Sequence, residues 1–259
     1  MNDTTHEDRI LDQFTRQATP FSTASPIADG NALRMIVDAG RPRPTDTVLD
    51  VACGGGLVVC AFAPHVRHAT GIDMTPAMLD RARQQATEKA VANVSWDRGD
   101  VTSLPYGDGA FDIVVTRFSM HHFLEPLAVM REMVRVCAPG GRVVVVDMYA
   151  LDDPAKAMEW NRAEKLRDPS HVRCLTLPEL KGLFGTTGLA TRHASFYELR
   201  DEIRNLLARS FPNPGDDAKI IEIYMASAED GRLGIPVRRT GERIDYAFPI
   251  AILAATKPD

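Results

Sequence analysis

The chain has 259 residues, of which 44% are hydrophobic and 25% charged, and its formal net charge at pH 7 is −5. This composition is typical of a soluble globular protein and excludes a mainly disordered or fibrous chain. The acidic balance argues against nucleic acid as a partner, because binding to phosphates needs a basic surface. No apolar run approaches the length of a transmembrane helix, and the N-terminus is too polar for a signal peptide.

The four cysteines, at positions 53, 60, 137 and 174, lack the paired short spacing of zinc ligands. Two of them stand beside glycines or inside apolar runs, where a cysteine usually acts as a small hydrophobic residue. We therefore expect no metal site. The same cysteine usage predicts a reduced, cytoplasmic setting.

Apolar residues at helical spacing predict a short helix over residues 6–17, followed by irregular chain. The segment 1–30 is expected either to pack on the edge of the domain or to act as a lid. As a lid it would bring Phe14 and Phe21 to a substrate pocket. A second amphipathic helix is predicted over residues 29–40, because a glycine that can end a helix closes the pattern.

Strand-like and helix-like segments then alternate as far as residue 150. The apolar runs that predict strands cover residues 48–51, 68–73, 94–96, 111–116 and 142–147. The helices between them are expected over residues 57–64, 76–90 and 126–137. This alternation predicts an α/β fold with a doubly wound parallel sheet and helices on both faces.

The pattern weakens beyond residue 150. A strand is expected over 189–196, and helices are expected over residues 152–168, 177–184, 198–210 and 217–228. The apolar run 245–256 predicts a final buried strand, although Pro249 requires an edge position or a bulge. Residues 151–259 are expected to complete the sheet and to supply helical segments of a substrate pocket.

The first predicted strand ends in the small residues Ala52 to Gly56, and this turn is typical of a cofactor site. Such a turn exposes backbone amides and lets a ligand approach the main chain closely. A dinucleotide fingerprint needs a further glycine, and Val59 occupies that position. The turn therefore disfavours a dinucleotide.

Acidic residues stand at the ends of three successive predicted strands, at Asp50, Asp73 and Asp100. An acid about 20 residues after the glycines can accept both ribose hydroxyls. An acid after the third strand can accept from an adenine amino group, and Asp50 is placed to face the ammonium of an amino acid. A pyrophosphate would be repelled by all three. The acids favour adenosine joined to an amino acid through a cation.

Four motifs in this order resemble those of class I S-adenosylmethionine-dependent methyltransferases. They are Val48-Leu-Asp-Val-Ala-Cys-Gly-Gly-Gly56, Gly71-Ile-Asp-Met-Thr-Pro-Ala-Met-Leu79, Gly99-Asp-Val-Thr-Ser-Leu-Pro-Tyr106 and Arg135-Val-Cys-Ala-Pro-Gly-Gly141. The likeness covers residues 10–150 and is nearest to the branch that includes the ubiquinone and menaquinone biosynthesis methyltransferases. The tail resembles uncharacterised bacterial members of that branch.

The resemblance implies a Rossmann-like, seven-stranded, mostly parallel sheet whose last strand is antiparallel. Residues 31–150 would form the core that binds S-adenosyl-L-methionine. The implied reaction transfers a methyl group to an oxygen, nitrogen or carbon atom of a small molecule and leaves S-adenosyl-L-homocysteine. Both a monomer and a homodimer are compatible with the sequence.

The resemblance also carries over a set of cofactor-binding positions. Those expected around the methionine part are Asp50, Ala52, Cys53, Gly54, Gly56, Arg117 and Phe118. Those expected around the ribose and the adenine are Asp73, Met74, Met78, Gly99, Asp100 and Val101. Alanine at position 52 replaces the glycine common in the family, and we expect this small residue to be tolerated.

The methyl group leaves a sulfonium by in-line displacement, so a base is needed only when the acceptor must lose a proton. His121 and His122 follow the fourth predicted strand and Asp147 ends the fifth, which makes a histidine oriented by an aspartate a candidate catalytic base. The alternative is that one histidine merely packs against the following helix. His171 and Arg173 are candidate substrate contacts, with a surface turn as the alternative.

Three functional hypotheses follow. The first is a small-molecule methyltransferase. The second is a non-catalytic S-adenosylmethionine-binding sensor or scaffold that lacks an acceptor pocket. The third, an NAD-dependent oxidoreductase, is disfavoured by the interrupted glycine pattern. The identity of the acceptor does not follow from any motif in residues 151–240.

Overall fold

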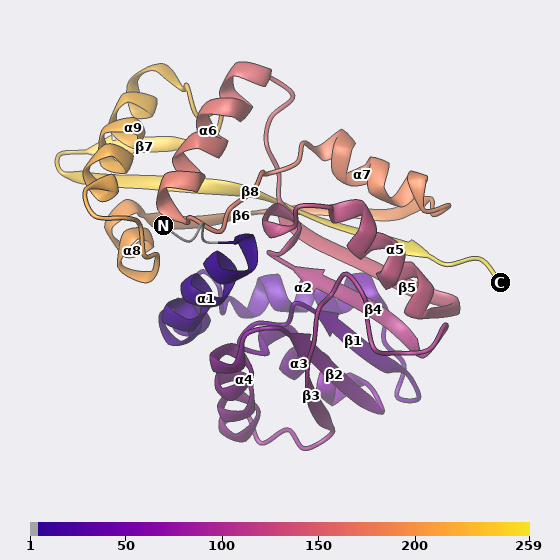
Figure 1. Cartoon of the computed structure of the whole chain (residues 1–259). Helices are drawn as coiled ribbons and strands as arrows, with labels where there is room; N and C mark the ends of the chain where they lie inside the picture. The colour runs from indigo at the N-terminus through magenta and orange to yellow at the C-terminus, as the bar shows by residue number, and fades with distance from the viewer. Residues whose placement is uncertain (1–4) are drawn as a thin grey trace.

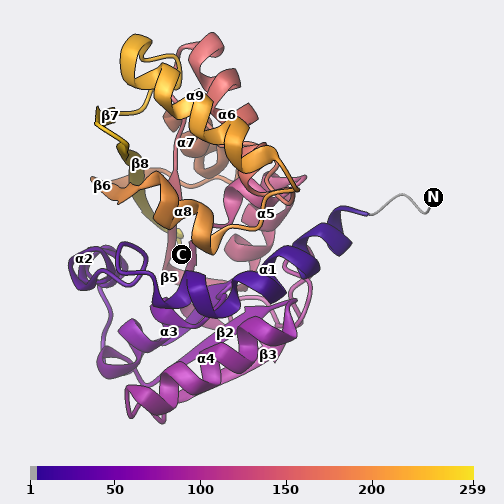
Figure 2. The same ribbon diagram turned by 90° about the vertical axis from the view of Figure 1, so that its left-hand side faces the viewer.

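One mixed sheet forms the centre of the molecule, and helices cover both of its faces (Figures 1 and 2). The structure is a computed structural model that describes residues 5–259, so residues 1–4 of the expected N-terminal segment lie outside the described residues. The strands of the described chain are β1 (Thr47–Val51), β2 (His68–Asp73), β3 (Val94–Arg98), β4 (Phe111–Arg117), β5 (Cys137–Met148), β6 (Thr191–Glu202), β7 (Val237–Thr240) and β8 (Arg243–Thr256).

The strand order is β3-β2-β1-β4-β5-β8-β6, with β7 paired to β8. The first five strands run parallel, whereas β8 is antiparallel to β5, β6 and β7. The chain moves outward from β1 to β3 and then returns to β4 on the other side of β1. Open sheets bind ligands at such a reversal of strand order. The predicted Rossmann-like, doubly wound sheet with an antiparallel last strand is confirmed.

Nine α-helices connect the strands of the described chain. They are α1 (His6–Thr23), α2 (Gly30–Gly40), α3 (Leu57–Phe62), α4 (Pro76–Glu88), α5 (Pro126–Val136), α6 (Pro154–Arg167), α7 (Leu177–Thr186), α8 (Ile203–Arg209) and α9 (Asp216–Asp230). Two short 3-10 turns, η1 (Ala63–His65) and η2 (Met120–His122), follow α3 and β4.

Strand β5 contains an unbroken run of four valines, Val143 to Val146, and its surroundings explain this run. Val144 and Val146 join a core cluster with residues of α2 and α3. Val143 and Val145 point the other way and join residues of α5 and α7. All four side chains are buried. A strand covered on both faces cannot alternate between apolar and polar residues, which explains the continuous valine run.

The prediction of a helix over residues 198–210 is wrong in its first part. Strand β6 continues to Glu202, and only residues 203–209 are helical. The register with β8 is unbroken from His193 to Glu202, where Glu202 pairs with Asp245. Strand pairing along this whole length outweighs the helical preference of the local sequence. Strand β7 was not predicted, because its four residues are too short to show a period.

The expectation of an edge or a bulge at Pro249 holds only locally, because at this residue β8 pairs with β6 alone. Strand β8 lies between β5 and β6, and its register with β6 shows no shift at Pro249. The ladder with β5 ends at the pair Met148–Ile250, and Ile250 is the residue that follows the proline. The Pro249 carbonyl still accepts from the Tyr149 amide at 3.2 Å. The missing N–H of proline therefore falls just where the β5 ladder stops.

Helix α1 is longer than predicted, since residues 18–23 are helical and not irregular. A capping box between Thr5 and Asp8 starts the helix. Pro20 removes one helical hydrogen bond, and two residues later the Ser22 hydroxyl donates to the Ala18 carbonyl at 2.6 Å. An added Cβ at Gly55 would overlap the Ser22 side chain, so the end of α1 packs directly on the glycine turn.

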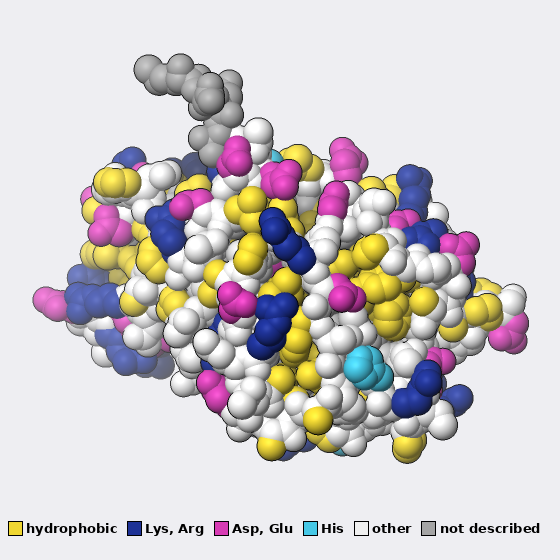
Figure 3. Space-filling view, turned by 60° about the horizontal axis from the view of Figure 1, so that its bottom comes forward, with side chains coloured by type: hydrophobic (Ala, Val, Ile, Leu, Met, Phe, Trp, Pro, Cys, Tyr) yellow, Lys and Arg dark blue, Asp and Glu magenta, His cyan; other side chains and the backbone are white. Residues whose placement is uncertain are grey.

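In the part of the chain that the structure describes, no helix combines the length and the apolar composition needed to cross a membrane. The face drawn in Figure 3 mixes acidic and basic side chains, with hydrophobic side chains between them. This mixed face fits the formal net charge of −5. It offers no broad basic surface of the kind that nucleic acid requires.

Candidate active site

A cavity of about 680 Å³ lies between helix α1 and the carboxyl ends of β1 to β4. This volume is within the usual range of small-molecule sites, about 300–1,000 Å³. Predicted cofactor-binding residues that line it are Asp50, Ala52, Cys53, Gly54, Asp73, Met74, Met78, Gly99, Asp100, Val101, Arg117 and Phe118. Phe14, Phe21 and His122 line it as well. The sheet thus brings together residues spread over more than a hundred positions of the sequence.

The turn after β1 has the backbone conformation that its small residues predict. Ala52, Gly54 and Gly56 all have positive φ, at 57°, 50° and 78°. An added Cβ at Gly56 would lie 2.6 Å from the Trp96 ring, whereas one at Gly54 would meet nothing closer than 3.8 Å. Gly56 therefore permits the close packing of strands and helices behind the turn. Gly54 keeps the cavity side of the turn open to a ligand.

Asp50 is a buried carboxylate with one oxygen that accepts no hydrogen bond from the described residues. Its side chain is 1% exposed, and the oxygen without a hydrogen bond is Oδ1. Burial raises the pKa of Asp50 well above its usual value, the nearby Asp73 raises it further, and the Arg117 charge only partly offsets this rise. Buried polar groups are normally satisfied, so a carboxylate with such an oxygen on a cavity wall fits a cationic ligand group. An amino-acid ammonium is such a group.

Asp73 and Asp100 have both oxygens engaged and still keep free lone pairs. Asp73 accepts from the Gly54 amide at 2.9 Å and from the Thr75 amide at 2.9 Å. It thereby holds the glycine turn against the end of β2. Asp100 accepts from the amide and the hydroxyl of Thr102 at 2.8 Å and 2.6 Å. Each carboxylate is thus fixed in place before a ligand arrives.

Arg117 and Phe118 close the cavity on the side of β4. The guanidinium of Arg117 is buried, donates to the Ile27 carbonyl at 2.9 Å and lies 4.4 Å from the centre of the Phe118 ring. Its Nε has no partner in the described chain. Phe118 has a φ of 57°, which is strained for an aromatic residue. Backbone strain of this kind is concentrated at functional sites.

The two adjacent histidines lie on η2, directly after β4, and both are buried. His121 Nδ1 is 2.6 Å from Asp147 Oδ1, so the expected contact between a histidine and this aspartate is present. Asp147 Oδ1 also accepts from the Met148 amide at 2.7 Å. His121 lines a second, smaller cavity of about 60 Å³ that adjoins the first. A catalytic role for this pair stays a prediction.

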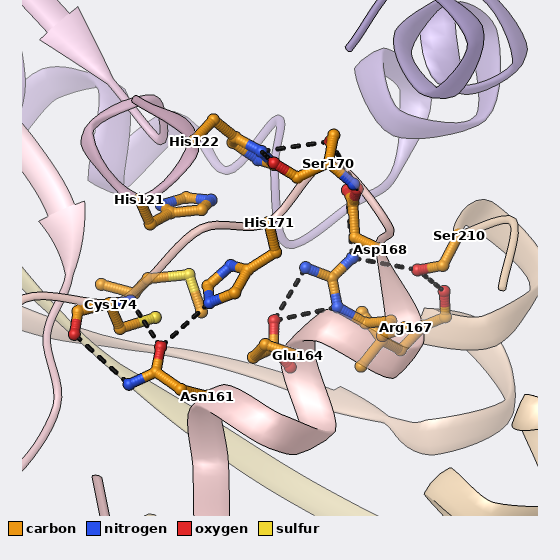
Figure 4. A network of polar contacts seen from close by, with 12 residues as sticks. His121, His122, Asn161, Glu164, Arg167, Asp168, Ser170, His171, Cys174 and Ser210 are labelled. Atoms are coloured by element: carbon orange, nitrogen blue, oxygen red, sulfur yellow. Dashed lines mark hydrogen bonds and ion pairs between the residues drawn. The ribbon is translucent and has the colours of Figure 1, made fainter. Parts of the chain in front are cut away.

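His122 lines both cavities, together with Phe14, Phe21, Ile27 and Phe118. Its Nδ1 lies 3.1 Å from the Ser170 carbonyl oxygen and 3.2 Å from the Ser170 hydroxyl (Figure 4). Burial, and to a smaller extent His121, lowers the pKa of His122 to about 4. The ring is therefore neutral at pH 7, with one of its two nitrogens unprotonated.

His171 and Arg173 line neither cavity. His171 is buried behind His121, with 5.5 Å between the ring centres, and its Nε2 lies 3.0 Å from Asn161 Oδ1 (Figure 4). Burial lowers its pKa well below the usual value. Arg173 is exposed and forms an ion pair with Glu179 at 2.9 Å. This arrangement gives no support to their predicted contact with substrate. Gly56 and Asp147, which were also predicted as site residues, likewise line neither cavity.

Some residues that line the larger cavity were not predicted as site residues from the sequence. They are His6, Glu7, Ile10, Leu11 and Ser22 from α1, with Thr75, Arg98, Thr102, Ser119 and Leu124 from the strand ends and the loops that follow them. The amphipathic pattern of α1 was the available signal for the first group. Ser170 and Asp168, which hold His122, carried no motif. Within residues 5–259, no group of three or more His, Cys, Asp or Glu side chains is arranged to hold a metal ion.

Comparison with known proteins identifies the family. A methyltransferase domain model matches residues 49–145. The chain is 31% identical over 247 residues to the uncharacterized methyltransferase YcgJ of Bacillus subtilis, a match that covers 94% of this chain and 97% of that protein. The ubiquinone/menaquinone biosynthesis C-methyltransferase UbiE of Roseobacter denitrificans is 35% identical over 154 residues, which cover 57% of this chain and 62% of UbiE.

The fold comparison agrees. The crystal structure of YcgJ has a TM-score of 0.81 at 30% identity and covers 88% of this chain and 99% of that one. A geranyl diphosphate methyltransferase in complex with S-adenosylmethionine has a TM-score of 0.63 at 18% identity, with 88% of this chain and 84% of that one covered, and so shows the fold alone.

The chain belongs to the class I S-adenosylmethionine-dependent methyltransferases. Within this class it is similar to YcgJ over nearly its whole length and to the UbiE enzymes over a little more than half of it. The hypotheses of an NAD-dependent oxidoreductase and of a non-catalytic sensor or scaffold are not favoured by these matches.

Proposed function

We propose that the protein transfers the methyl group of S-adenosyl-L-methionine to a small molecule whose acceptor atom carries a proton. The observation that carries this proposal is the buried Asp50 carboxylate, whose Oδ1 accepts no hydrogen bond from the described residues, on the wall of a 680 Å³ cavity that His122 also lines. A cationic amino-acid group satisfies the carboxylate, and a neutral histidine serves an acceptor that must be deprotonated.

The cavity wall offers partners for each part of the methyl donor. Asp50 would take the ammonium, and the amides of the glycine turn would take the carboxylate. Asp73 would accept from the ribose hydroxyls, and Asp100 with the Val101 amide would hold the adenine edge. Met74 and Met78 would pack on the adenine and beside it. When bound, S-adenosyl-L-methionine supplies an electrophilic methyl group on a sulfonium.

On the acceptor side we assign the base to His122, with His121 and Asp147 as a supporting pair. The ring of His122 takes the proton of the acceptor atom. The electron pair left on that atom forms the new bond to the methyl carbon, and the carbon–sulfur pair leaves with sulfur. The positive charge thus moves from the sulfonium to the imidazole, and the thioether product is neutral.

Helix α1 would act as the lid over this reaction. Its residues Phe14 and Phe21 line both cavities, so they separate the donor from solvent. We propose a division into a lid (residues 1–30), a donor-binding core (31–150) and a part that completes the acceptor side (151–259). All four cysteines are unpaired and buried, which supports the reduced, cytoplasmic setting predicted from the sequence.

Calorimetry tests the donor first. S-adenosylmethionine and S-adenosylhomocysteine should bind, and NAD should not. Release of S-adenosylhomocysteine with a panel of phenols, amines and carbon acids then tests turnover. Binding of NAD alone would contradict the assignment. Binding of S-adenosylmethionine without turnover of any acceptor would favour the sensor or scaffold hypothesis.

A further inference from the structure

We propose that Gln17, Asp168 and Ser170 are positioning residues that hold His122 with its proton on Nδ1 and its Nε2 lone pair free for the acceptor. The inference rests on the proposed function, in which His122 is the base. Each of the three acts through His122 and none is assigned a contact with substrate. Asp168 and Ser170 follow α6 (Figure 4), and Gln17 comes from α1, so the base is held by segments far apart in the chain.

Asp168 determines which groups donate and which accept in this set of hydrogen bonds. Its Oδ1 accepts from the Ser170 amide at 2.9 Å and lies 2.5 Å from the Ser170 hydroxyl oxygen. An ionised carboxylate can only accept, so the hydroxyl proton points to Asp168. Ser170 Oγ then presents only lone pairs to His122.

His122 Nδ1 consequently faces two acceptors. They are the Ser170 carbonyl oxygen at 3.1 Å and the Ser170 hydroxyl oxygen at 3.2 Å. In a neutral imidazole one nitrogen donates and the other accepts, so the proton is on Nδ1. Nε2 is left as the basic atom, and it makes no hydrogen bond within the described chain. The ring itself borders both cavities.

Asp168 is kept ionised by its surroundings. Although burial acts in the opposite direction, the charge of Arg167 and the hydrogen bonds from Ser170 hold the pKa of Asp168 below its usual value. The second oxygen, Oδ2, accepts from Gln17 Nε2 at 3.1 Å and lies 3.9 Å from Arg167 Nη1. Gln17 therefore completes the anchor from the other side.

Helix α1 contacts this assembly at three points. Gln17 bonds Asp168, and the Phe14 ring meets the His122 ring edge-on with 5.0 Å between their centres. His6 Nε2 lies 2.8 Å from the His122 carbonyl oxygen. The His121–Asp147 pair, in contrast, is formed within the core by η2 and β5. Only the His122 base therefore depends on the position of the lid helix.

The test compares Asp168→Asn and Gln17→Leu with Gln13→Leu, a buried glutamine of the same helix that lines neither cavity. The first readout is the nitrogen NMR spectrum of histidine rings in the ligand-free protein, with His122 identified through His122→Gln. Wild-type His122 should show the Nδ1–H tautomer. Asp168→Asn should raise the Nε2–H fraction, because it frees the Ser170 hydroxyl to donate to Nδ1.

The second readout is kinetic. Asp168→Asn should lower kcat about 10- to 100-fold and Gln17→Leu about 10-fold, both smaller than removal of the base itself. Affinity for S-adenosylmethionine should stay within about twofold of wild type in both variants, and Gln13→Leu should match wild type, because none of the three residues lies among the donor contacts. A wild-type Nε2–H tautomer would overturn the proposal, as would an Asp168→Asn protein with unchanged tautomer and kcat. If the wild-type protein turns over no acceptor, the proposed function fails. The NMR spectrum of the ligand-free protein still decides whether Gln17, Asp168 and Ser170 hold the proton of His122 on Nδ1.

Discussion

The two sides of the cavity are built in different ways. The donor side comes from residues 50–101, at the ends of three adjacent parallel strands, and much of it is backbone held by short-range bonds such as Asp73 to Gly54. The acceptor side is made by side chains from α1, η2 and the segment after α6. The donor side is built from residues close together in the sequence, and a similar arrangement recurs at the end of each of these strands. The acceptor side forms only when segments far apart in the sequence have packed together.

The largest effect is expected on the acceptor side, from His122→Gln. Loss of the base should lower kcat about 1,000-fold, within the usual contribution of general base catalysis. Affinity for S-adenosylmethionine should be unchanged. His68→Gln, which removes a histidine bonded to Ser95 in the sheet, is the matched control and should retain full activity. A wild-type kcat in His122→Gln would move the base to His121 and Asp147.

On the donor side, Gly56→Ala should damage the fold itself. The added Cβ would lie 2.6 Å from the Trp96 ring, and the φ of 78° is unfavourable for any L-residue. Together these effects should reduce the free energy of unfolding by about 3 kcal/mol. Chemical denaturation measures the loss. Gly107→Ala, where an added Cβ meets nothing, should be neutral, and equal losses in both variants would contradict the packing argument.

Asp50→Asn separates donor binding from stability. Loss of the charge that faces the ammonium should weaken S-adenosylmethionine binding about 30-fold, or about 2 kcal/mol. The ligand-free variant should nevertheless melt at a higher temperature, because a buried carboxylate with an oxygen that accepts no hydrogen bond within the described chain is removed. Asp112→Asn, distant from the cavity and bonded to Thr47, is the control and should leave donor affinity unchanged. Unaltered affinity in Asp50→Asn would contradict the assigned contact.

The same carboxylate predicts a pH dependence of stability. Burial first, and Asp73 second, raise the pKa of Asp50 well above 3.8 in the folded protein. A carboxyl group whose pKa is raised in the folded protein contributes its full stabilisation at pH values below its pKa in the unfolded chain. This contribution is lost as the pH rises through its pKa in the folded protein. The stability advantage of ligand-free Asp50→Asn over wild type should therefore grow as pH increases from about 4. A stability difference between Asp50→Asn and wild type that stays constant with pH would contradict this prediction.

The smallest effect is expected from Ala52→Gly. Its φ of 57° costs an alanine about 1–2 kcal/mol, while glycine adds about 0.4–1 kcal/mol of chain entropy to the unfolded state. The net change in unfolding free energy should be below about 1 kcal/mol, with donor affinity unchanged. Ala90→Gly, at a φ of 52° outside the cavity, should give a similar small change in denaturation. A large loss of affinity would show that Ala52 contributes a specific contact.

The difference between the two sides also explains what could be predicted from the sequence. Continuous apolar runs such as Val143 to Val146 predict buried parallel strands, and topology alone then carries Asp50, Asp73 and Asp100 to one edge. These three acids line the cavity as expected. The contact between His121 and Asp147 followed from the same logic of strand ends.

The acceptor side could not be predicted, because its contacts have no local pattern. Ser170 and Gln17 are ordinary polar residues in the sequence, and only the docking of α1 gives them a role. His171 and Arg173 were also predicted to contact substrate, yet neither of them lines a cavity. The boundary errors have the same origin, since pairing with β8 extends β6 through a segment with helical preference.

The position of β8 has a consequence for the order of events during synthesis. Strand β8 follows β6 in the chain, yet it lies between β5 and β6 and is the only strand of the described sheet that pairs with β6. The five parallel strands can assemble while later residues are still being added. Strand β6 has no place in the sheet until β8 has emerged. A nascent chain should therefore acquire its donor half early and complete its acceptor half only after residue 256 leaves the ribosome.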